Sequence, residues 1–404
     1  MSEAFSDSNA VELFFKKTIY FLFFFFVFYP YISFVDIGTD MQPYSIILAA
    51  VIFFMFRVRL TYNQLFIALI FLYSFFVLLT SGLSFTSFRS FFNYSSLFFI
   101  SYATFKVLRE ERLNFELFLK SSIIIWLLVG MVQTLYSRTF LNFIISGSRT
   151  TDSRGVVGLA PEPTFYGIVL IFFIIFLLHM EVKNKKFYIL SCITGIVFFA
   201  QSSMAVLFLL IMSFFYLLTH FKFKYLVFFV VSLFLVPALL VDLLPTTRLS
   251  FLINKILEEP EALILIDASI NDRFFHVFFS LKGMFDNYLF PNGFQSWNIY
   301  VSEQLPQYSD VVIVEWFSVG GRIMSGYGAA FFELGFIAVF IPVAMFGLLY
   351  SIYRNNVKKL MFFFLFVNAI MFSAIPIGFS LFGFYLGFLG YLSWKKTRIR
   401  VCYV

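Results

Sequence analysis

Residues 163–180 read PTFYGIVLIFFIIFLLHM, a run without a single Asp, Glu, Lys or Arg. A helix of about 20 apolar residues crosses the roughly 30 Å hydrocarbon core of a bilayer, so this run predicts a membrane-spanning helix. The whole chain has the same character, because 61% of its 404 residues are hydrophobic, 23% are aromatic and only 13% are charged. Soluble domains are charged over about a quarter of their residues. The composition therefore excludes an ordinary soluble domain and predicts an all-α, polytopic integral membrane protein.

Apolar runs of similar length recur along the chain, and we count about twelve of them. The connections within residues 187–219 and 359–394 are very short, so a merged or re-entrant pair there would change the number. The sequence predicts a single transmembrane domain over residues 1–404. The runs lie at approximately 18–35, 43–57, 63–80, 90–106, 116–136, 163–180, 187–201, 203–219, 225–243, 328–350, 359–375 and 377–394.

The basic residues indicate how these runs are oriented. Lys and Arg resist translocation whereas Asp and Glu contribute little, so loops rich in Lys and Arg stay in the cytoplasm. Every second gap is basic, which predicts that both termini are cytoplasmic and that the net charge of +7 belongs to membrane edges, with no nucleic-acid partner. The basic residues concerned are Lys16, Lys17, Arg57, Arg59, Lys106, Arg109, Arg112, Lys183, Lys185, Lys186, Lys222, Lys224, Arg354, Lys358, Lys359, Lys395, Lys396, Arg398 and Arg400.

Two loops on the outer face, residues 137–161 and 244–327, carry nearly all the remaining polar sequence. The predicted spans hold almost no charge, so the relay of intramembrane acids that a proton-coupled pump needs is missing. We therefore expect the active-site region in these two loops. The sequence contains no Walker A loop, GxGxxG motif, DxD motif or His pair at helical spacing, and we expect no metal and no soluble cofactor.

The first outer loop combines two arginines, Arg149 and Arg154, with a carboxylate, Glu162, between two prolines. Arginine suits phosphate because its planar guanidinium makes paired hydrogen bonds and keeps its charge. A helix that begins near Pro163 would also point its free N–H groups at this loop. The structural alternative is that the arginines touch lipid headgroups while Glu162 fills a favourable position in the first turn of the helix.

The second outer loop contains a helical pattern over residues 271–285. The pattern predicts an interfacial helix lying along the membrane surface. In the functional reading Arg273 and His276 face a substrate phosphate or hydroxyl, and in the structural reading they are solvated above an apolar underside. Helical spacing places Arg273, His276 and Ser280 on one face and Phe274, Phe278, Leu281 and Phe285 largely on the other.

Aromatic and charged residues continue through the rest of this loop, among them Trp297, Arg322 and Tyr327. Aromatic rings beside carboxylates are suited to sugars, because the rings stack on flat CH faces and the carboxylates accept hydrogen bonds from hydroxyls. The same residues also suit an interfacial aromatic belt. This pattern alone therefore leaves both readings open.

Arg154 followed by residues 158–167, GLAPEPTFYG, resembles the start of a membrane helix in bacterial oligosaccharide repeat-unit polymerases, the Wzy or O-antigen polymerase group. The Gln201-Ser202-Ser203 break resembles a serine-containing interruption in that family. The resemblance covers roughly residues 140–340, and the first four runs match only in hydropathy. It is completed by the Arg273 helix with Asn287, Pro291 and Gly293, and by Ser325-Gly326-Tyr327-Gly328 with Glu333-Leu334-Gly335.

Two details bear on this resemblance. The related O-antigen ligases usually carry a His-Asn pair before the Glu-x-Gly motif, and here Met324 and Ser325 occupy that place, which favours a polymerase. The spacings from Arg154 to Gly167 and from Arg273 to Gly283 depart from the arginine–glycine pattern of the polymerase outer loops. This departure bears on the roles of individual residues and not on the loops involved.

The resemblance implies a membrane glycosyltransferase of GT-C-like architecture in the bacterial cytoplasmic (inner) membrane, with its active site facing the periplasm or the exterior. It would transfer a growing glycan from one polyprenyl-pyrophosphate-linked oligosaccharide to another and make O-antigen, capsular or exopolysaccharide chains. The family also implies a chain-length regulator and a flippase as partners. A ligase, or a transporter of lipid-linked oligosaccharide, is the alternative, and the charge-poor spans and long outer loop argue against transport.

For this reaction we predict Arg154 and Arg273 to bind the pyrophosphates, with Arg149 and Arg322 as supporting contacts. No metal is needed if arginines neutralise the leaving group. Glu162 is the first candidate for the base that accepts the proton of the acceptor hydroxyl, and His276 is the second. The residues predicted to contact the sugars are Tyr166, Trp297 and Tyr327.

Overall fold

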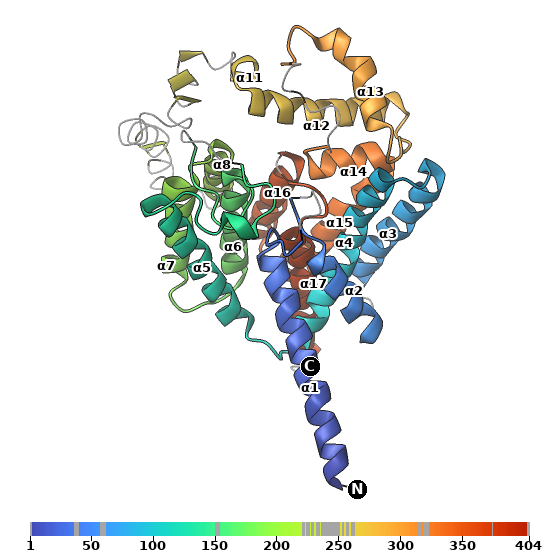
Figure 1. Ribbon diagram of the computed structural model, residues 1–404, viewed down its shortest axis with the longest axis vertical. Helices are drawn as coiled ribbons and strands as arrows, with labels where there is room; N and C mark the ends of the chain where they lie inside the picture. The colour runs from blue at the N-terminus through green and yellow to red at the C-terminus, as the bar shows by residue number, and fades with distance from the viewer. Residues whose placement is uncertain are drawn as a thin grey trace. The chain divides into compact units, whose positions relative to one another are not determined.

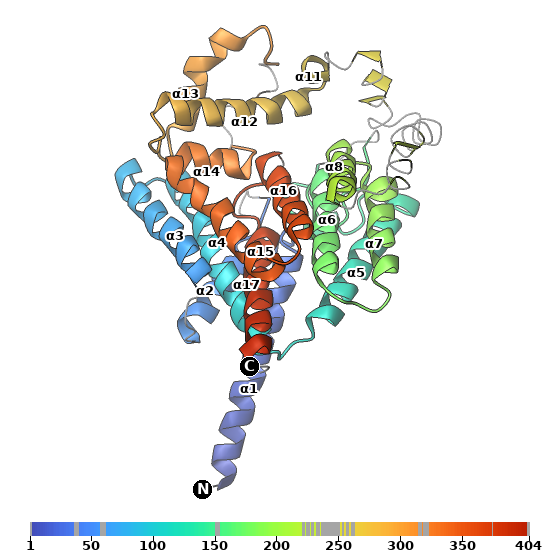
Figure 2. The same ribbon diagram turned by 180° about the vertical axis from the view of Figure 1, so that it is seen from behind.

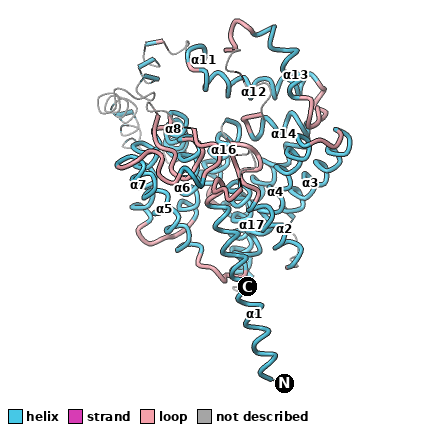
Figure 3. The backbone as a smooth tube through the Cα atoms, viewed as in Figure 1, coloured by secondary structure: helices cyan, strands magenta, loops and turns pink. Residues whose placement is uncertain are grey.

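A computed structural model of the chain describes residues 2–35, 40–56, 62–149, 154–219, 263–313, 317, 323–373 and 375–401, with isolated positions between 223 and 259 (Figure 1). Throughout these residues the regular structure is helical, and the one β-type pairing is an isolated bridge between Ile32 and Ile145 (Figure 3). The prediction of an all-α protein is confirmed.

Each predicted apolar run overlaps helical structure, except for 225–243, which lies almost wholly outside the described residues. The run 328–350 is divided into two helices by a 3-10 turn at Gly335–Val339. The short connections also separate distinct helices, because α7 and α8 are broken at Gln201 and Ser202 and α16 ends at Ser373 before α17 begins at Ser380. The helices are α1 Ser2–Phe28, α2 Tyr44–Met55, α3 Tyr62–Ser81, α4 Phe85–Arg109, α5 Phe115–Leu135, α6 Pro163–His179, α7 Lys185–Thr194, α8 Ser203–Thr219, α11 Leu263–Ile266, α12 Ala268–Asp286, α13 Trp297–Gln304, α14 Gly326–Leu334, α15 Phe340–Tyr353, α16 Val357–Ser373 and α17 Ser380–Val401.

Three stretches of the described chain are long and apolar enough to cross a membrane: Gln64–Ser81, Phe115–Leu135 and Gly326–Tyr353. Shorter apolar helices are Tyr44–Met55, Pro163–His179 and Ser203–Thr219. These helices are what a multi-pass membrane protein requires. The count of twelve spans and their orientation remain predictions.

The chain folds into two compact units, each made of segments that are far apart in the sequence. Unit 1 comprises residues 1–60, 99–206 and 380–404, and unit 2 comprises residues 61–98 and 207–379. The first outer loop therefore belongs to unit 1 and the second to unit 2.

The core of unit 1 is built around α6, whose residues from Phe165 to Leu177 are all buried. Phenylalanines fill the space around it. Phe28 stacks on Phe173 with ring centroids 5.5 Å apart, and it meets Phe384 edge to face at 5.1 Å. Such geometry places the positive edge of one ring against the negative face of another. A central, fully covered helix holds its own first residue, and hence Glu162 before it, in a fixed position.

Unit 2 contains two packing layers that position the second outer loop. Seen from behind in Figure 2, α3 runs along α15, and Phe66 lies 5.7 Å from Phe340 between ring centroids. The helix α12 packs on α14, where a Cβ added to Gly283 would lie 2.5 Å from Phe332 Cε2. The helix α14 begins with a side-chain cap, because Ser325 Oγ accepts a hydrogen bond from the Gly328 N–H at 2.9 Å.

Candidate functional site

Three charged side chains meet at the head of α6 in unit 1. The Arg149 guanidinium donates to both carboxylate oxygens of Asp40, at 3.0 and 3.1 Å, and its Nε lies 3.1 Å from Glu162 Oε1. One arginine thus bridges two carboxylates. The Glu162 side chain keeps 22% of its surface exposed, so it is only partly covered by the protein.

The backbone around Arg149 is fixed by two neighbouring segments. The Arg149 N–H donates to Pro161 O at 2.7 Å, and the Ser33 N–H donates to Ile144 O at 2.8 Å beside the Ile32–Ile145 bridge. The segment after α1 is thereby paired with the first outer loop, which brings Asp40 to Arg149. Asp40 was not identified in the sequence analysis. The only feature that distinguishes Asp40 in the sequence is that it is an acid in a short gap between two apolar runs.

Glu162 occupies the N-cap position of α6, and Pro163 is the first residue of the helix, as predicted. Proline is favoured there because its missing N–H would have had no partner within the helix. The Glu162 side chain does not cap the helix. Its carboxylate pairs with Arg149 instead, so Glu162 combines a position at the start of the helix with an ion pair.

The loop that carries Arg154 is docked on the break between α7 and α8. A π-helical turn, Gly195–Ala200, ends at Gln201 with a φ of 43°, and the Val156 N–H donates to Phe199 O at 2.9 Å. Ser202 Oγ hydrogen-bonds to Thr164 Oγ1 of α6 at 3.1 Å. The two sequence features of unit 1 that carried the family resemblance, the Arg154 loop and the serine-containing break, therefore lie together.

Gln133 of α5 fixes the same loop from the other side, with its side chain buried. Its Oε1 accepts from the Gly158 N–H at 2.7 Å, and its Nε2 donates to Gly158 O and to Phe140 O, both at 2.8 Å. Gly158 has a φ of 61°, and a Cβ there would lie 3.0 Å from the Tyr166 ring. Glycine suits this position because it adopts a positive φ without strain.

Replacing Gln133 by Leu is expected to lower the free energy of unfolding by about 2 to 6 kcal/mol, because the two buried backbone groups of Gly158 would lose their partners at about 1 to 3 kcal/mol each. The check is the thermal midpoint of the detergent-purified protein. Gln307→Leu, at an exposed position of unit 2, is the matched control and is expected to leave the midpoint unchanged. Equal midpoints for the two variants would contradict this role of Gln133.

Tyr166, predicted to contact sugar, lies in the interior of unit 1. Its ring stacks on Trp126 with centroids 5.7 Å apart, and its Oη donates to Trp126 O at 3.1 Å. The hydroxyl is therefore used within the protein in this arrangement. Its predicted sugar contact has no geometric support here.

In unit 2 the predicted outer helix is present as α12, and it begins earlier than expected, at Ala268. Asp267 caps it by accepting from the Ile270 N–H at 2.9 Å. The predicted face with His276 and Ser280 is not exposed, whereas exposure of the opposite apolar face agrees with an interfacial helix. His276 and Ser280 are fully buried, whereas Phe274 and Phe285 are exposed.

The reason is that the following segment folds back over the His276 face. Its cover consists of a buried apolar cluster with Trp297, Val301, Val312, Phe317 and Ile323. Asn271 ties this cover down, because its Nδ2 donates to Val311 O at 2.8 Å and its Oδ1 accepts from the Ile313 N–H at 3.0 Å. Helical spacing alone could not predict that the following segment buries this face of α12.

His276 is enclosed by aromatic rings. It stacks on Trp297 and on Phe317, with centroid distances of 5.3 and 4.9 Å, and its Nε2 lies 3.3 Å from Asp272 Oδ1. Neither a solvated nor a substrate-facing His276 fits this burial. Arg273, which follows Asp272 in α12, is half-buried.

The other predicted contacts of this loop divide between buried and undescribed positions. Trp297 and Tyr327 are buried, and among the described residues neither Trp297 Nε1 nor Tyr327 Oη has a hydrogen-bond partner. Buried polar groups without a partner are rare in proteins. Arg322 lies outside the described residues.

A carboxylate at the far end of α12 ties this helix to α13. Asp286 Oδ2 accepts from Lys282 Nζ at 2.6 Å and from Tyr300 Oη at 2.7 Å. The hydrogen bonds from Lys282 and then Tyr300 lower the pKa of Asp286. A carboxyl group with a lowered pKa stabilises the fold above its ordinary pKa, and this contribution is lost as the pH falls through its folded-state value.

Sequence reasoning quoted Glu333 within a motif but missed its partners. Its two carboxylate oxygens accept from Ser90 Oγ at 2.8 Å and from Tyr94 Oη at 2.5 Å, both on α4. This polar cluster joins two helices of unit 2 inside an otherwise apolar layer.

No part of the described chain brings three or more His, Cys, Asp or Glu side chains together in a way that would hold a metal ion. Comparison with protein-family models gives no match, and no curated protein is significantly similar to the chain. The geometry of the two units is therefore the basis for a functional proposal.

Proposed function

We propose that this chain polymerises polyprenyl-pyrophosphate-linked oligosaccharide repeat units at the outer face of the bacterial cytoplasmic membrane. The observation that supports it most is the head of α6, where Arg149 holds Glu162 at 3.1 Å beside the docked loop of Arg154. This arrangement offers cationic groups and a carboxylate in one region of a multi-pass membrane protein. The product would be an O-antigen, capsular or exopolysaccharide chain.

In the proposed step, the acceptor hydroxyl of one repeat attacks the anomeric carbon of the donor glycan. A new glycosidic C–O bond forms, the bond from the anomeric carbon to the pyrophosphate oxygen breaks, and polyprenyl pyrophosphate leaves with the electron pair. Glu162 takes the proton of the acceptor hydroxyl. Arg154 and Arg149 stabilise the charge that develops on the leaving group.

Glu162 is preferred to His276 as the base because the two differ in accessibility. The Glu162 carboxylate is partly exposed, whereas the His276 ring is buried between Trp297 and Phe317. In this proposal His276 packs within the second outer loop and does not meet the substrate. Arg273 remains a candidate for a substrate contact in unit 2, whereas Trp297 is buried in the same cluster as His276.

The gel profile of surface polysaccharide from the source bacterium, with and without this gene, tests the proposed function. Loss of the gene is expected to collapse a long ladder to a single capped repeat. Complete loss of attached glycan, with long lipid-linked chains accumulating, would instead indicate a ligase. An unchanged ladder would exclude both enzymes.

Arg154→Ala is expected to slow polymerisation by roughly 10- to 100-fold, because a hydrogen bond to a charged group contributes about 1.5 to 3 kcal/mol. The readout is ladder length in cells that carry the variant at wild-type abundance. Arg109→Ala is the matched control, since the Arg109 guanidinium lies over the Trp394 ring, 5.1 Å from its centroid, away from the outer loops. A full-length ladder with Arg154→Ala would remove this residue from the site.

A further inference from the structure

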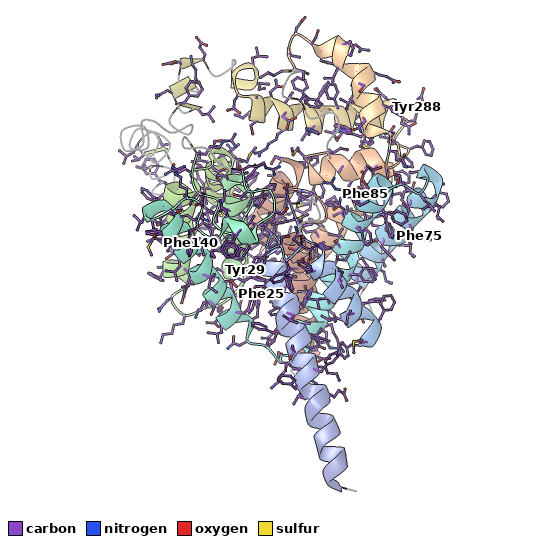
Figure 4. The ribbon with its side chains drawn as sticks, viewed as in Figure 1. Phe25, Tyr29, Phe75, Phe85, Phe140 and Tyr288 are labelled. Carbon is purple, nitrogen blue, oxygen red and sulfur yellow. The ribbon has the colours of Figure 1, made fainter. Side chains whose placement is uncertain are left out.

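A turn of exposed aromatic residues follows α12 in unit 2. Phe285, Tyr288 and Phe290 expose 64%, 84% and 63% of their surface, and Figure 4 labels Tyr288 at the outer edge of the ribbon. Residues 287–295 read NYLFPNGFQ and contain no charged residue. A contiguous exposed apolar patch of this kind marks a surface that meets a partner or a membrane.

The turn is held in a strained conformation. Tyr288 and Leu289 have φ values of 53° and 68°, which bulky residues rarely adopt. The Leu289 N–H donates to Met284 O at 2.8 Å, and Leu289 O accepts from the Phe336 N–H at 2.9 Å. Strain of this kind persists only where the surroundings enforce it, and it is found at functional surfaces.

The end of α14 provides part of this enforcement. Gly335 has a φ of 63°, and a Cβ at this position would lie 2.4 Å from Leu289 O. Asn292 adds a second connection, because its N–H donates to Phe332 O at 3.1 Å. The turn is thereby fixed to the stretch Gly326–Tyr353, which is long and apolar enough to cross a membrane.

The turn is also fixed to the end of a second candidate span, Gln64–Ser81. The Phe294 N–H donates to Ser81 Oγ at 3.1 Å, and Gln295 Nε2 donates to Ser81 O at 3.1 Å and to Ser87 Oγ at 2.8 Å. Because this span ends at Ser81, these hydrogen bonds place the turn at the level of the membrane boundary.

Further exposed aromatic residues lie on α3 and at the start of α4. Phe75 and Phe76 on α3 and Phe85 at the start of α4 are exposed, and Figure 4 shows Phe75, Phe85 and Tyr288 on the same side of the ribbon. Tyrosine is enriched where the bilayer meets water, since its ring is apolar and its hydroxyl is hydrated. The turn and the exposed rings of the candidate span Gln64–Ser81 therefore lie on one side of unit 2.

We propose that the rings of Phe285, Tyr288 and Phe290 insert into the headgroup region of the bilayer and anchor the second outer loop to the membrane surface. The partner is lipid, because residues 287–295 carry no charge and the neighbouring Asp286 is paired with Lys282 at 2.6 Å. The turn also lies at the end of a candidate span, on the side where Phe75 and Phe85 are exposed. The anchor does not depend on the proposed polymerase activity. It holds α12, and with it Arg273, close to the membrane.

A fluorescent probe on a single cysteine tests the anchor in the full-length chain. Tyr288→Cys, in a background of Cys192→Ala and Cys402→Ser, is labelled with an environment-sensitive nitrobenzoxadiazole dye. The labelled protein is reconstituted into vesicles of phosphatidylethanolamine and phosphatidylglycerol that carry a nitroxide on the upper acyl chain. Quenching by this lipid is compared with quenching by aqueous iodide.

The expected result is several-fold stronger quenching by nitroxide lipid at position 288 than at Ser302→Cys, an exposed polar position on α13. Phe85→Cys is the positive control and should behave like position 288. Iodide that quenches position 288 as well as position 302 would overturn the anchor. So would protection from both quenchers, because another protein would then cover the turn. Phe290→Cys provides the same comparison if Tyr288→Cys does not fold.

Discussion

Polymerisation is expected to fall by about 100- to 10,000-fold when Glu162 is replaced by Gln, because this is the usual contribution of a positioned general base. The glutamine keeps the shape of the side chain and removes its ability to accept the proton of the acceptor hydroxyl. Its amide oxygen can still accept the hydrogen bond from Arg149, whose Nε lies 3.1 Å from Glu162 Oε1 in the present structure. The measurement is the length distribution of surface polysaccharide at equal abundance of the variant.

Glu116→Gln is the matched control for this substitution. Glu116 also pairs with a basic side chain, Lys120, at 2.6 Å within α5. Such pairs at the surface of a helix contribute little to stability, so an unchanged ladder is expected. If Glu162→Gln left the ladder intact while Arg154→Ala abolished it, the base role would be wrong and the anion-binding role would stand.

Gly155→Ala is expected to destabilise the fold by about 3 kcal/mol or more, since extra atoms in a closely packed region force the backbone to move. A Cβ at this position would lie 2.0 Å from Ala200 O and 2.4 Å from Phe199 O. These atoms are backbone and cannot rotate away. The loop that carries Arg154 would therefore detach from the break between α7 and α8, and polymerisation would be lost with it.

The thermal midpoint and the polysaccharide ladder together measure this effect. Gly390→Ala in α17 is the matched control, because a Cβ there would make an ordinary contact of 3.5 Å with Phe105 Cδ2. Alanine in a helix interior is favoured over glycine by about 1 kcal/mol, so no loss is expected. A Gly155→Ala protein with the wild-type midpoint and ladder would contradict the docked loop.

The positions of the helices could be predicted from the sequence because each depends on neighbouring residues. The run at 163–180 became α6 within one residue, and Pro163 correctly marked its start. The run at 203–219 likewise became α8. Long apolar runs and a proline at the first helical position act locally, so no tertiary information was needed.

The partners of the site residues could not be predicted in the same way. Arg149 was recognised, but Asp40, which lies over a hundred positions earlier, reaches it only through the pairing of the segment after α1 with the first outer loop. Gln133 looked like an ordinary polar residue near the end of an apolar run. Its three hydrogen bonds depend on where the loop around Gly158 returns to α5.

The second outer loop shows the same limit at the level of a helix face. Helical spacing placed His276 and Ser280 on one face, but it could not say whether water or protein would cover that face. The segment that contains Trp297 and Phe317 covers it, and Asn271 holds that segment in place.

The sequence by itself therefore determined an all-α chain with apolar helices, the approximate positions of these helices, and the two polar segments between them. Only the tertiary structure decided that Arg149 bridges Asp40 and Glu162, that His276 is buried, and that the turn at Tyr288 projects at the end of α3. The physical reason is the separation in sequence between the residues that interact. Helix formation depends on hydrogen bonds and side chains within a few residues, whereas burial and ion pairing depend on segments that meet only after the chain has folded.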